Sequence, residues 1–395
     1  MVSVAEAERI ILGHLFQPKE AKVKLTQAVG KVLAEEIKAD RDLPPFNRAT
    51  MDGIAISIES FQNGQRIFSV ESMQAAGQPQ QVLSDKKKCI EIMTGAPLPV
   101  GTDTVVPYEM ISIQTKTASL SETKIERAQN VHQRGSDARQ GDLLLSKGGR
   151  LSPAEIALLA SLGKSEVRVY QPPRAAVIST GDELVEVNET PLPHQIRKSN
   201  SYALEAALQT LGANADSFHF KDDKEEIANS VKAILEKYEL VILSGGVSKG
   251  KLDFVPEALE SLGVKKLFHG VSQRPGKPMW FGASSKNFVF ALPGNPVSTF
   301  LCFHRYVVPW LTKSMCDSAT DSVAILASDF SFGPLLTYFL QVKIKNENGK
   351  LMAYPAAGGG SGDFANLKDV DGFLQLPLEQ NEFKAGEVYP AYLFR

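Results

Sequence analysis

The strongest indication of the fold is the stretch RAAVIST at Arg174–Thr180, together with the loop Gly181-Asp182-Glu183-Leu184 that follows it. The small and β-branched apolar residues of this stretch predict a strand. A helix capped by Asn200 and closed by Gly212 is predicted next. A strand, a loop and a helix in this order form the repeating unit of a parallel sheet that is covered by helices.

The same order recurs further along the chain. Strands are predicted at Glu239–Ser244, Lys265–Phe268 and Asn287–Leu292, and helices are predicted to begin near Asp223 and Val297. The loops that follow two of these strands read Ser-Gly-Gly-Val-Ser and Leu-Pro-Gly-Asn-Pro-Val-Ser. Ligands of an open α/β sheet bind beyond the carboxyl ends of its strands, where glycine N–H groups and Ser or Thr hydroxyls suit an anion. Three such loops together predict an anion-binding edge.

Acidic residues accompany these loops. Glu183 follows the first strand, Asp222 stands before a helix, and Asp253 comes after the second loop. Carboxylates near a phosphate site favour Mg²⁺, which takes oxygen ligands and bridges to phosphate oxygens. A structural alternative stays open for Asp253, which could instead cap a helix that begins near Val255.

Two further segments bear on phosphate binding. Arg274-Pro275-Gly276-Lys277-Pro278 places two cations around a rigid turn, which could clamp an anion or simply be a solvated surface turn. Gly358–Gly362 lacks the helix pattern that follows a dinucleotide fingerprint and is interpreted as a loop. The chain contains no Gly-x-x-x-x-Gly-Lys-Ser/Thr stretch, which disfavours an ordinary P-loop ATPase.

The remaining segments predict three more domains. Residues 46–135 hold short β-branched runs between turn residues, whereas residues 1–45 are predicted to be helical, with a capped helix after Ser3 and a second helix over Thr26–Ile37. A helix that begins at Ser152 and ends at Gly163 can pack with these, so the first domain is discontinuous. The predicted fold is an α/β multidomain protein with these parts: a discontinuous helical domain at 1–45 with 136–171, a β-rich domain at 46–135, an α/β domain with a parallel-rich sheet at 172–315, and a C-terminal β-barrel-like domain at 316–395.

Composition narrows the class of protein. The 395 residues carry 43 Lys and Arg against 45 Asp and Glu, and this near-neutral balance argues against a bulk nucleic-acid binder. The three cysteines, Cys89, Cys302 and Cys316, form no Cys-x-x-Cys pair, so neither a zinc site nor a disulfide scaffold is supported. The N-terminus does not resemble a signal peptide, and prolines and charges interrupt the longest apolar region, about Phe288 to Leu311. We expect a cytoplasmic protein that does not span a membrane.

Seven short motifs follow one another along the chain. They are ThrMetAspGly at 50–53, ThrGlyAlaProLeuPro at 94–99, SerThrGlyAspGluLeu at 179–184, SerAsn at 199–200, SerGlyGlyValSer at 244–248, ProGlyLysPro at 275–278 and ProGlyAsnProValSer at 293–298. Read together, they resemble the MoeA and gephyrin E-domain family, the molybdopterin molybdenumtransferases, over nearly the whole chain. The resemblance implies an enzyme that inserts molybdenum from molybdate into adenylylated molybdopterin, releases AMP and uses Mg²⁺. It also implies that the α/β domain is MogA-like and binds molybdopterin.

The resemblance implies roles for individual residues. The catalytic positions would be Asp52, Thr94, Asp137, Glu183, Asp222 and Asp253, and the metal would be held by Glu183, Asp222 and Asp253. The substrate-binding positions would be Thr180, Gly181, Ser199, Asn200, Ser244, Gly245, Gly246, Ser248, Arg274, Lys277, Pro293, Gly294, Asn295, Pro296 and Ser361. The family is a homodimer whose β-rich domain faces the partner's pterin-binding domain, so Asp52 and Thr94 would complete the site of the other subunit. Partner proteins would be a MogA-type adenylyltransferase or recipient apo molybdoenzymes.

Four positions depart from the family pattern. Gly270 stands where a basic residue is common and Gln341 where an arginine is expected, which removes two candidate contacts to the oxyanion or the pterin. Lys198 replaces a common acid before Ser199-Asn200, and Glu239 replaces an Asp that often opens the strand.

Two other functions compete with this interpretation. A MogA-type adenylyltransferase shares the α/β domain and the Ser-Gly-Gly loop, but a stand-alone enzyme of that type lacks the β-rich domain around Asp52 and Thr94. A scaffold role like that of gephyrin usually brings linkers and partner-binding tails, which this sequence does not show.

Overall fold

The computed structural model describes residues 1–121, 124–220, 224–246, 255–316 and 322–395. The chain divides into two compact units by its internal contacts. One unit comprises Met1–Glu35, Lys147–Ala160 and Lys164–Arg395, and the other comprises Glu36–Ser146 and Ser161–Gly163. The four-domain boundaries given above stay a prediction.

A six-stranded sheet forms the centre of the first unit. Its strands, in spatial order, are β16 (Ala215–Phe220), β13 (Ala175–Thr180), β17 (Leu240–Ser244), β21 (Phe288–Leu292), β20 (Trp280–Ala283) and β18 (Lys265–His269). The first four strands are parallel, β20 runs antiparallel to its neighbours β21 and β18, and β18 therefore has the same direction as the first four strands. This arrangement confirms the predicted parallel-rich sheet, and it places the carboxyl ends of β13, β17 and β21 along one edge.

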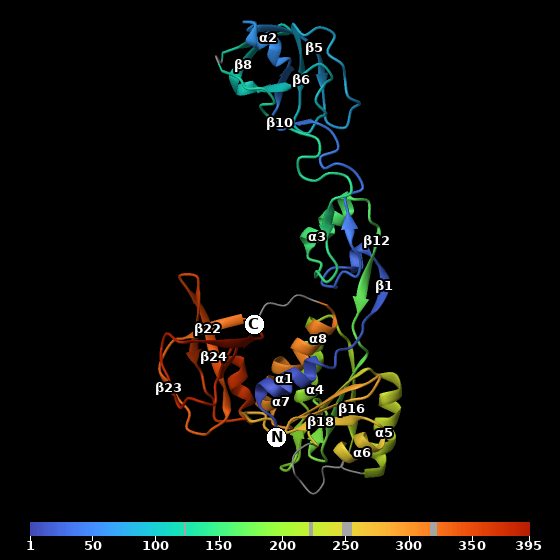
Figure 1. Cartoon of the computed structure of the whole chain (residues 1–395), viewed down its shortest axis with the longest axis vertical. Coiled ribbons are helices and arrows are strands. Elements are labelled where there is room, and N and C mark those ends of the chain that lie inside the picture. Colours follow the sequence, from blue (N-terminus) through green and yellow to red (C-terminus); the bar gives the residue numbers. More distant parts are fainter. Residues whose placement is uncertain (122–123, 221–223, 247–254, 317–321) are drawn as a thin grey trace. The chain divides into compact units, whose positions relative to one another are not determined.

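Helices cover both faces of this sheet, and every residue of β13 is therefore buried. Ala175 and Val177 point into a core shared with one set of helices, and Ala176 and Ile178 point into a second core on the opposite face. The first set comprises α1 (Val4–Leu12), α4 (Asn200–Thr210), α7 (Pro296–Cys302), the π-helix η3 (Phe303–Val307) and α8 (Val308–Ser314); the second comprises α5 (Lys224–Lys237) and α6 (Val255–Ser261) (Figure 1).

The C-terminal strands close into a barrel-like sheet. In order they are β19 (Gln273–Arg274), β24 (Thr337–Glu347), β25 (Lys350–Pro355), β22 (Ser322–Leu326), β28 (Val388–Leu393) and β26 (Gly372–Leu376). An additional pairing of β24 with β26 closes the five strands from β24 to β26, and β19 pairs with β24 alone among the described strands. A buried core that includes Leu340, Leu374 and Phe383 fills the interior. Short elements complete this part: β23 (Phe330–Ser331) pairs with β27 (Glu382–Phe383), and η4 (Phe364–Lys368) is a 3₁₀ helix.

The segment after α1 differs from the sequence prediction. A strand, β1 (Lys19–Lys24), pairs with β12 (Glu166–Gln171), and a 3₁₀ turn, η1 (Leu25–Gln27), follows. The predicted helix over Thr26–Ile37 is wrong, because Gly30 adopts a left-handed φ of 76° and Leu33 pairs with Val169 of β12. The predicted helix after Ser152 is confirmed as α3 (Pro153–Ser161). It has a reciprocal cap, in which Ala154 N donates to the serine Oγ at 3.1 Å and Ser152 N donates to Glu155 Oε2 at 2.8 Å.

The second unit is rich in strands, as predicted. Its six-stranded sheet has the order β7 (Thr104–Pro107), β4 (Gly53–Ile56), β6 (Lys88–Ile92), β5 (Ile67–Gln74), β9 (Thr117–Leu120) and β8 (Ile111–Gln114). Two smaller pairs join β3 (Arg48–Ala49) to β10 (Val131–His132) and β2 (Ile37–Lys38) to β11 (Leu143–Leu145). The helical elements are α2 (Ile58–Gln62) and the 3₁₀ helix η2 (Tyr108–Met110).

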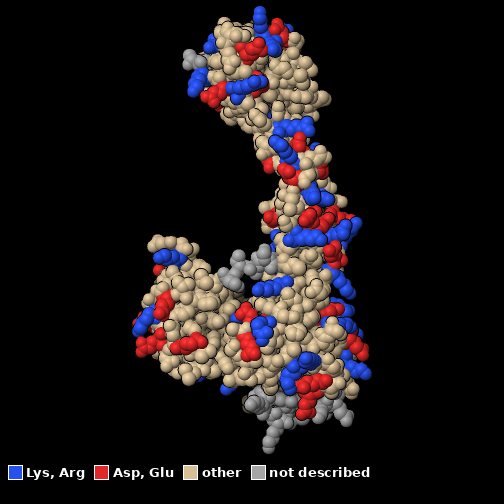
Figure 2. All heavy atoms as spheres, in the orientation of Figure 1, with Lys and Arg blue, Asp and Glu red and all other residues tan. Residues whose placement is uncertain are grey.

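Charged side chains of both signs are interspersed on the face drawn in Figure 2, in agreement with the net charge of -2. Within the described residues, no helix has the length and apolar character needed to cross a membrane.

Candidate active site

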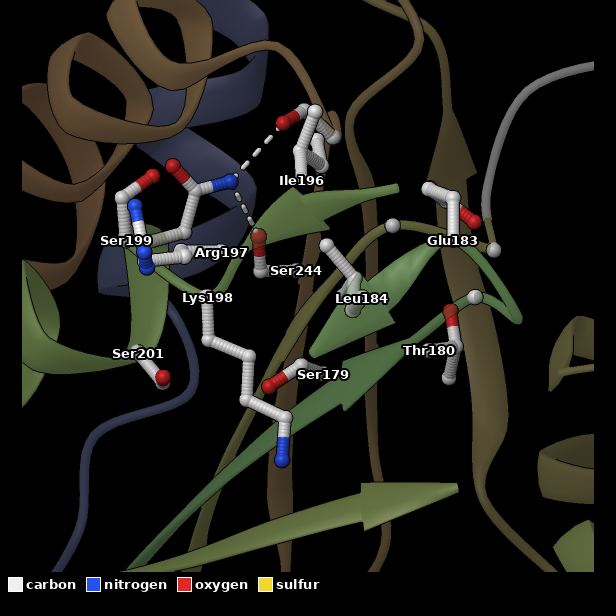
Figure 3. A pocket seen from close by; sticks show the side chains of 15 residues that line it. Ser179, Thr180, Glu183, Leu184, Ile196, Arg197, Lys198, Ser199, Ser201 and Ser244 are labelled. Atoms are coloured by element: carbon white, nitrogen blue, oxygen red, sulfur yellow. Dashed lines mark hydrogen bonds between the residues drawn. The ribbon is translucent and has the colours of Figure 1, made fainter. Parts of the chain in front are cut away.

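Three loops at the carboxyl ends of β13, β17 and β21 meet around a cavity of about 180 Å³, which we call the loop pocket (Figure 3). The start of α4 and the short pair β14 (Leu184–Val185) and β15 (Ile196–Arg197) complete its wall. The lining residues are Ser179, Thr180, Gly181, Glu183, Leu184, Ile196, Arg197, Lys198, Ser199, Asn200, Ser201, Ser244, Gly245, Gly246 and Gly294. The structure therefore brings nine sequence-predicted site residues together: Thr180, Gly181, Glu183, Ser199, Asn200, Ser244, Gly245, Gly246 and Gly294.

Asn200 holds the loops in place. Its Nδ2 donates to Ser244 Oγ at 2.8 Å, to the Gly294 carbonyl at 2.8 Å and to Thr299 Oγ1 at 3.2 Å (dashed lines in Figure 3 mark bonds between drawn residues). The prediction that Asn200 caps α4 is wrong: Ser199 occupies the cap position, and Asn200 is the first helical residue. Its amide is used for tertiary hydrogen bonds between loops instead of for the helix terminus.

The loop pocket contains a buried hydroxyl without a hydrogen-bond partner among the described residues. The hydroxyl of Ser179 is buried, since only 3% of this residue is exposed, and it has no hydrogen-bond partner among the described residues. Gly245 adopts a φ of 100°, and a Cβ there would lie 3.1 Å from Thr180 Oγ1, so a larger residue would be strained and crowd the wall. A buried polar atom without a partner is costly unless a ligand satisfies it, so this pocket has the character of a binding site.

Sequence reasoning missed two residues at this pocket: Lys198, which lines it, and His219, which contacts the lining residue Ser179. Lys198 is nine-tenths buried, and its ammonium pairs with the half-exposed Glu186. His219, at the end of β16, has its Nδ1 3.2 Å from the Ser179 carbonyl. Burial lowers the pKa of His219, and the nearby Lys198 lowers it further. The departure of Lys198 from the family pattern was the one signal that could have drawn attention to this wall.

Of the three predicted metal ligands, Glu183 is the one that lies within the described residues. A Cβ at Gly181 would lie 2.4 Å from Glu183 Oε2, which shows that this carboxylate folds back over the glycine. Asp222, Asp253 and the substrate-binding candidate Ser248 lie outside the described residues. Across the described ranges, no three His, Cys, Asp or Glu side chains gather as a metal-binding group. Among the described residues that line the loop pocket, Glu183 is the one carboxylate, and it offers the hard oxygen donor that Mg²⁺ prefers.

A second cavity of about 510 Å³, the turn pocket, lies between the Arg274–Pro278 turn, the Pro293–Ser298 loop and the C-terminal barrel. Of the predicted residues it gathers Arg274, Lys277, Pro293, Asn295 and Ser361, whereas Pro296 is the first residue of α7 and does not line it. Asn295 Nδ2 donates to Ser361 Oγ at 2.8 Å, which links the loop to the glycine-rich segment.

Charge in the turn pocket is one-sided. Arg274 and Lys277 are the charged residues of its lining, and neither forms an ion pair with another described residue. Gln341, which stands where the family pattern expects an arginine, also lines this pocket and accepts a hydrogen bond from Asn366 Nδ2 at 3.3 Å. Gly270 is not among the lining residues.

The departure at Glu239 has a structural explanation. Its carboxylate accepts hydrogen bonds from the backbone N and the guanidinium of Arg174, at 2.9 and 3.0 Å. These bonds join the segments that open β13 and β17.

The second unit pairs two other predicted residues. Asp52 Oδ1 accepts from Thr94 N at 2.6 Å and from Thr94 Oγ1 at 2.8 Å. These two donors lower the pKa of Asp52 below its ordinary value of 3.8, with the backbone donor as the larger cause. The segment around Asp52 and the Thr94 loop are held by main-chain bonds, in which Ala49 N donates to the Ala96 carbonyl and Gly95 N to the Ala49 carbonyl.

Asp137 belongs to a chain of three side chains in the same unit. Arg48 Nη2 donates to His132 Nδ1 at 3.1 Å, and His132 Nε2 lies 2.7 Å from Asp137 Oδ1. A guanidinium only donates, so Nδ1 accepts and the imidazole proton lies on Nε2, from which it is donated to Asp137. Arg48 and His132 thus orient a predicted catalytic acid, and neither residue lies within the seven motifs.

Comparisons with known proteins agree along the whole chain. Residues 2–163 match the MoeA N-terminal region (domains I and II), residues 176–313 a probable molybdopterin binding domain, and residues 323–394 the MoeA C-terminal region (domain IV). A molybdopterin molybdenumtransferase from Synechocystis is 42% identical over 397 residues, which cover 99% of this chain and 100% of the relative. One from Bacillus subtilis is 30% identical over 407 residues, which cover 100% and 94%. The crystal structure of a MoeA protein of molybdopterin biosynthesis from Pyrococcus horikoshii aligns with a TM-score of 0.86 at 28% identity and covers 100% of both chains. The chain therefore belongs to the MoeA family, the molybdopterin molybdenumtransferases of molybdenum cofactor biosynthesis.

Proposed function

We propose that this enzyme inserts molybdenum from molybdate into adenylylated molybdopterin and releases AMP. The loop pocket carries the proposal: three polar loops meet at the carboxyl ends of parallel strands and leave the Ser179 hydroxyl buried without a partner among the described residues. A pyrophosphate-linked substrate requires hydroxyl and backbone N–H donors of this kind.

The turn pocket supports a place for molybdate. This tetrahedral dianion favours cations and N–H donors, and Arg274 and Lys277 supply two positive charges in a lining that contains no acid among the described residues. The two pockets share the loop 293–298, because Gly294 lines one and Pro293 and Asn295 line the other. An oxyanion bound in the turn pocket would therefore lie next to a substrate held in the loop pocket.

Mg²⁺ belongs to the proposal through Glu183, with Asp222 and Asp253 as further ligands. When bound, the ion would draw negative charge from the pyrophosphate group. One or two carboxylates are sufficient for Mg²⁺, since it keeps several waters and takes substrate phosphate oxygens as ligands.

Asp52, Thr94 and Asp137 would act from the β-rich unit. We propose a homodimer in which Asp52 and Thr94 of one subunit complete the site of the partner subunit. The two Thr94 donors keep Asp52 ionised and fix the direction of Oδ1, so the acid could orient a reacting water or the metal. A MogA-type adenylyltransferase would supply the substrate, and apo molybdoenzymes would receive the product.

The test is AMP release by the purified protein given adenylylated molybdopterin and Mg²⁺, with and without molybdate. We expect AMP release that depends on molybdate and a product that activates an apo molybdoenzyme. Substrate binding without molybdate-dependent release would contradict the proposed reaction while leaving the binding role of the loop pocket in place.

A further inference from the structure

The N-terminus of helix α4 borders the loop pocket, and its cap residue does not form a side-chain hydrogen bond to the N–H groups of the first turn. Helix α4 has 11 residues, and the Ser199 side chain at its cap position forms no capping hydrogen bond. Ser199, Asn200 and Ser201 all line the pocket, so the first turn of the helix borders it. The N-terminal N–H groups and the helix dipole there favour an anion.

Ser179 points to a ligand independently of the helix. Its hydroxyl lies on β13, is buried, and lacks a partner among the described residues, although it lines the same cavity. A hydroxyl can donate to an anionic oxygen, which would satisfy this buried group.

Lys198 adds a positive charge to the pocket wall, and its ammonium can exchange Glu186 for another anionic partner. Its side chain is 10% exposed, and its partner Glu186 lies outside the pocket lining and is 50% exposed. Because the Glu186 carboxylate is half exposed, water can take the place of the lysine there, and a lysine ammonium on a flexible stem can move to another partner. The lining carries Glu183 against Arg197 and Lys198, which leaves one net positive charge.

We propose that Lys198 directly binds a phosphoryl oxygen of the substrate in the loop pocket, and that Glu186 competes with that oxygen for the ammonium. The inference rests on the proposed function, since it assumes that a pyrophosphate-linked substrate enters this pocket. It assigns to this chain a cation at a position where the family pattern has an acid. The phosphoryl group would lie between the Lys198 ammonium, the Ser179 hydroxyl and the first turn of α4.

The test is a calorimetric titration of the full-length protein with inorganic pyrophosphate in the absence of divalent cations. Lys198→Gln removes the cation and should weaken binding about tenfold, because a charge-assisted hydrogen bond is lost. Glu186→Gln removes the competitor and should tighten binding, about twofold to fivefold. Lys265→Gln, an exposed lysine at the start of β18, has the same change in net charge and should alter affinity less than about twofold.

Lys198→Gln and Glu186→Gln are expected to change the pyrophosphate affinity in opposite directions, which makes the test decisive. Lys198→Arg keeps the charge and should retain binding within about threefold, which separates loss of charge from damage to the fold. Equal affinities for Lys198→Gln and Lys265→Gln, weaker binding by Glu186→Gln, or no pyrophosphate binding by the unaltered protein would each overturn the inference. Failure of molybdate-dependent AMP release with these affinities intact would instead count against the proposed reaction alone.

Discussion

The loop pocket and the Asp52 segment handle their polar groups in opposite ways. In the β-rich unit, Asp52 Oδ1 accepts hydrogen bonds from both Thr94 donors, and Asp137 Oδ1 accepts a hydrogen bond from His132 Nε2. In the α/β domain, the Ser179 hydroxyl stays unpartnered within the described structure, and the cap position of α4 supplies no side-chain acceptor. The β-rich unit therefore presents acids that are already oriented by the protein, whereas the loop pocket holds hydrogen-bond donors that a ligand can satisfy. This division agrees with the proposed function, in which the acids position reacting groups and the loop pocket binds an anion.

The largest effect is expected from Asp52→Asn, which removes the charge of the oriented acid and keeps its shape. Turnover with molybdate should fall about 100-fold or more, the usual loss when a catalytic acid or base is removed. Pyrophosphate affinity should stay within about twofold, because the loops that bind it are unchanged. AMP release and calorimetry measure the two quantities.

Asp85→Asn is the matched control for this variant. Asp85 is an exposed turn residue of the same unit, and its Oδ1 accepts from Lys87 N, so its loss should leave turnover unchanged. Full turnover by Asp52→Asn with an unaltered circular dichroism spectrum would remove Asp52 from the reaction.

A smaller effect is expected from Asn200→Ala, which removes the hydrogen bonds that connect the pocket loops. The Ser244 hydroxyl and the Gly294 carbonyl would lose a shared donor, which should lower the local opening free energy by about 1–3 kcal/mol. Backbone hydrogen exchange at residues 244–246, 292, 294 and 295 should speed up, and pyrophosphate should bind more weakly. Gln209→Ala, on the exposed side of α4, should leave this exchange unchanged; unaltered exchange in Asn200→Ala would show that the loops hold their positions without it.

The smallest effect is expected from Thr94→Val, which removes one of the two donors to Asp52. The backbone donor stays, so the pKa of Asp52 should rise only part of the way towards its ordinary value of 3.8. Because the native pKa is lowered, the associated stabilisation exists above pH 3.8 and is lost as the pH falls through the native pKa. The acid limb of the turnover profile should therefore move to higher pH, with turnover at neutral pH changed less than about threefold.

The control for the pH profile is Thr102→Val. The Thr102 hydroxyl donates to the Pro99 carbonyl within the same loop and does not contact Asp52, so the profile should not move. A profile of Thr94→Val that coincides with that of the unaltered protein would mean that the Thr94 hydroxyl does not tune the acid.

Local signals in the sequence were reliable where a structure depends on neighbouring residues. The Ser152 to Glu155 spacing predicted the start of α3, and the RAAVIST run predicted β13. The helix expected over Thr26–Ile37 failed because pairing of Leu33 with the distant Val169 outweighs local helix propensity. The prediction that Asn200 caps the helix failed because of distant residues as well. Nothing nearby in the sequence shows that Ser244 and Gly294 lie within reach of the Asn200 amide.

The family and the residue types of the site can be read from the amino-acid sequence, because ordered motifs and strand–loop–helix periodicity are local properties of the chain. Which residues meet depends on the folded chain: Asn200 with Ser244 and Gly294, Asp52 with Thr94, Asp137 with His132 and Arg48, and Lys198 with Glu186. The fold also leaves the Ser179 hydroxyl without a partner among the described residues. The physical reason is that burial and hydrogen-bond satisfaction depend on which segments pack together, and segments tens of residues apart carry no mark of this in their own composition.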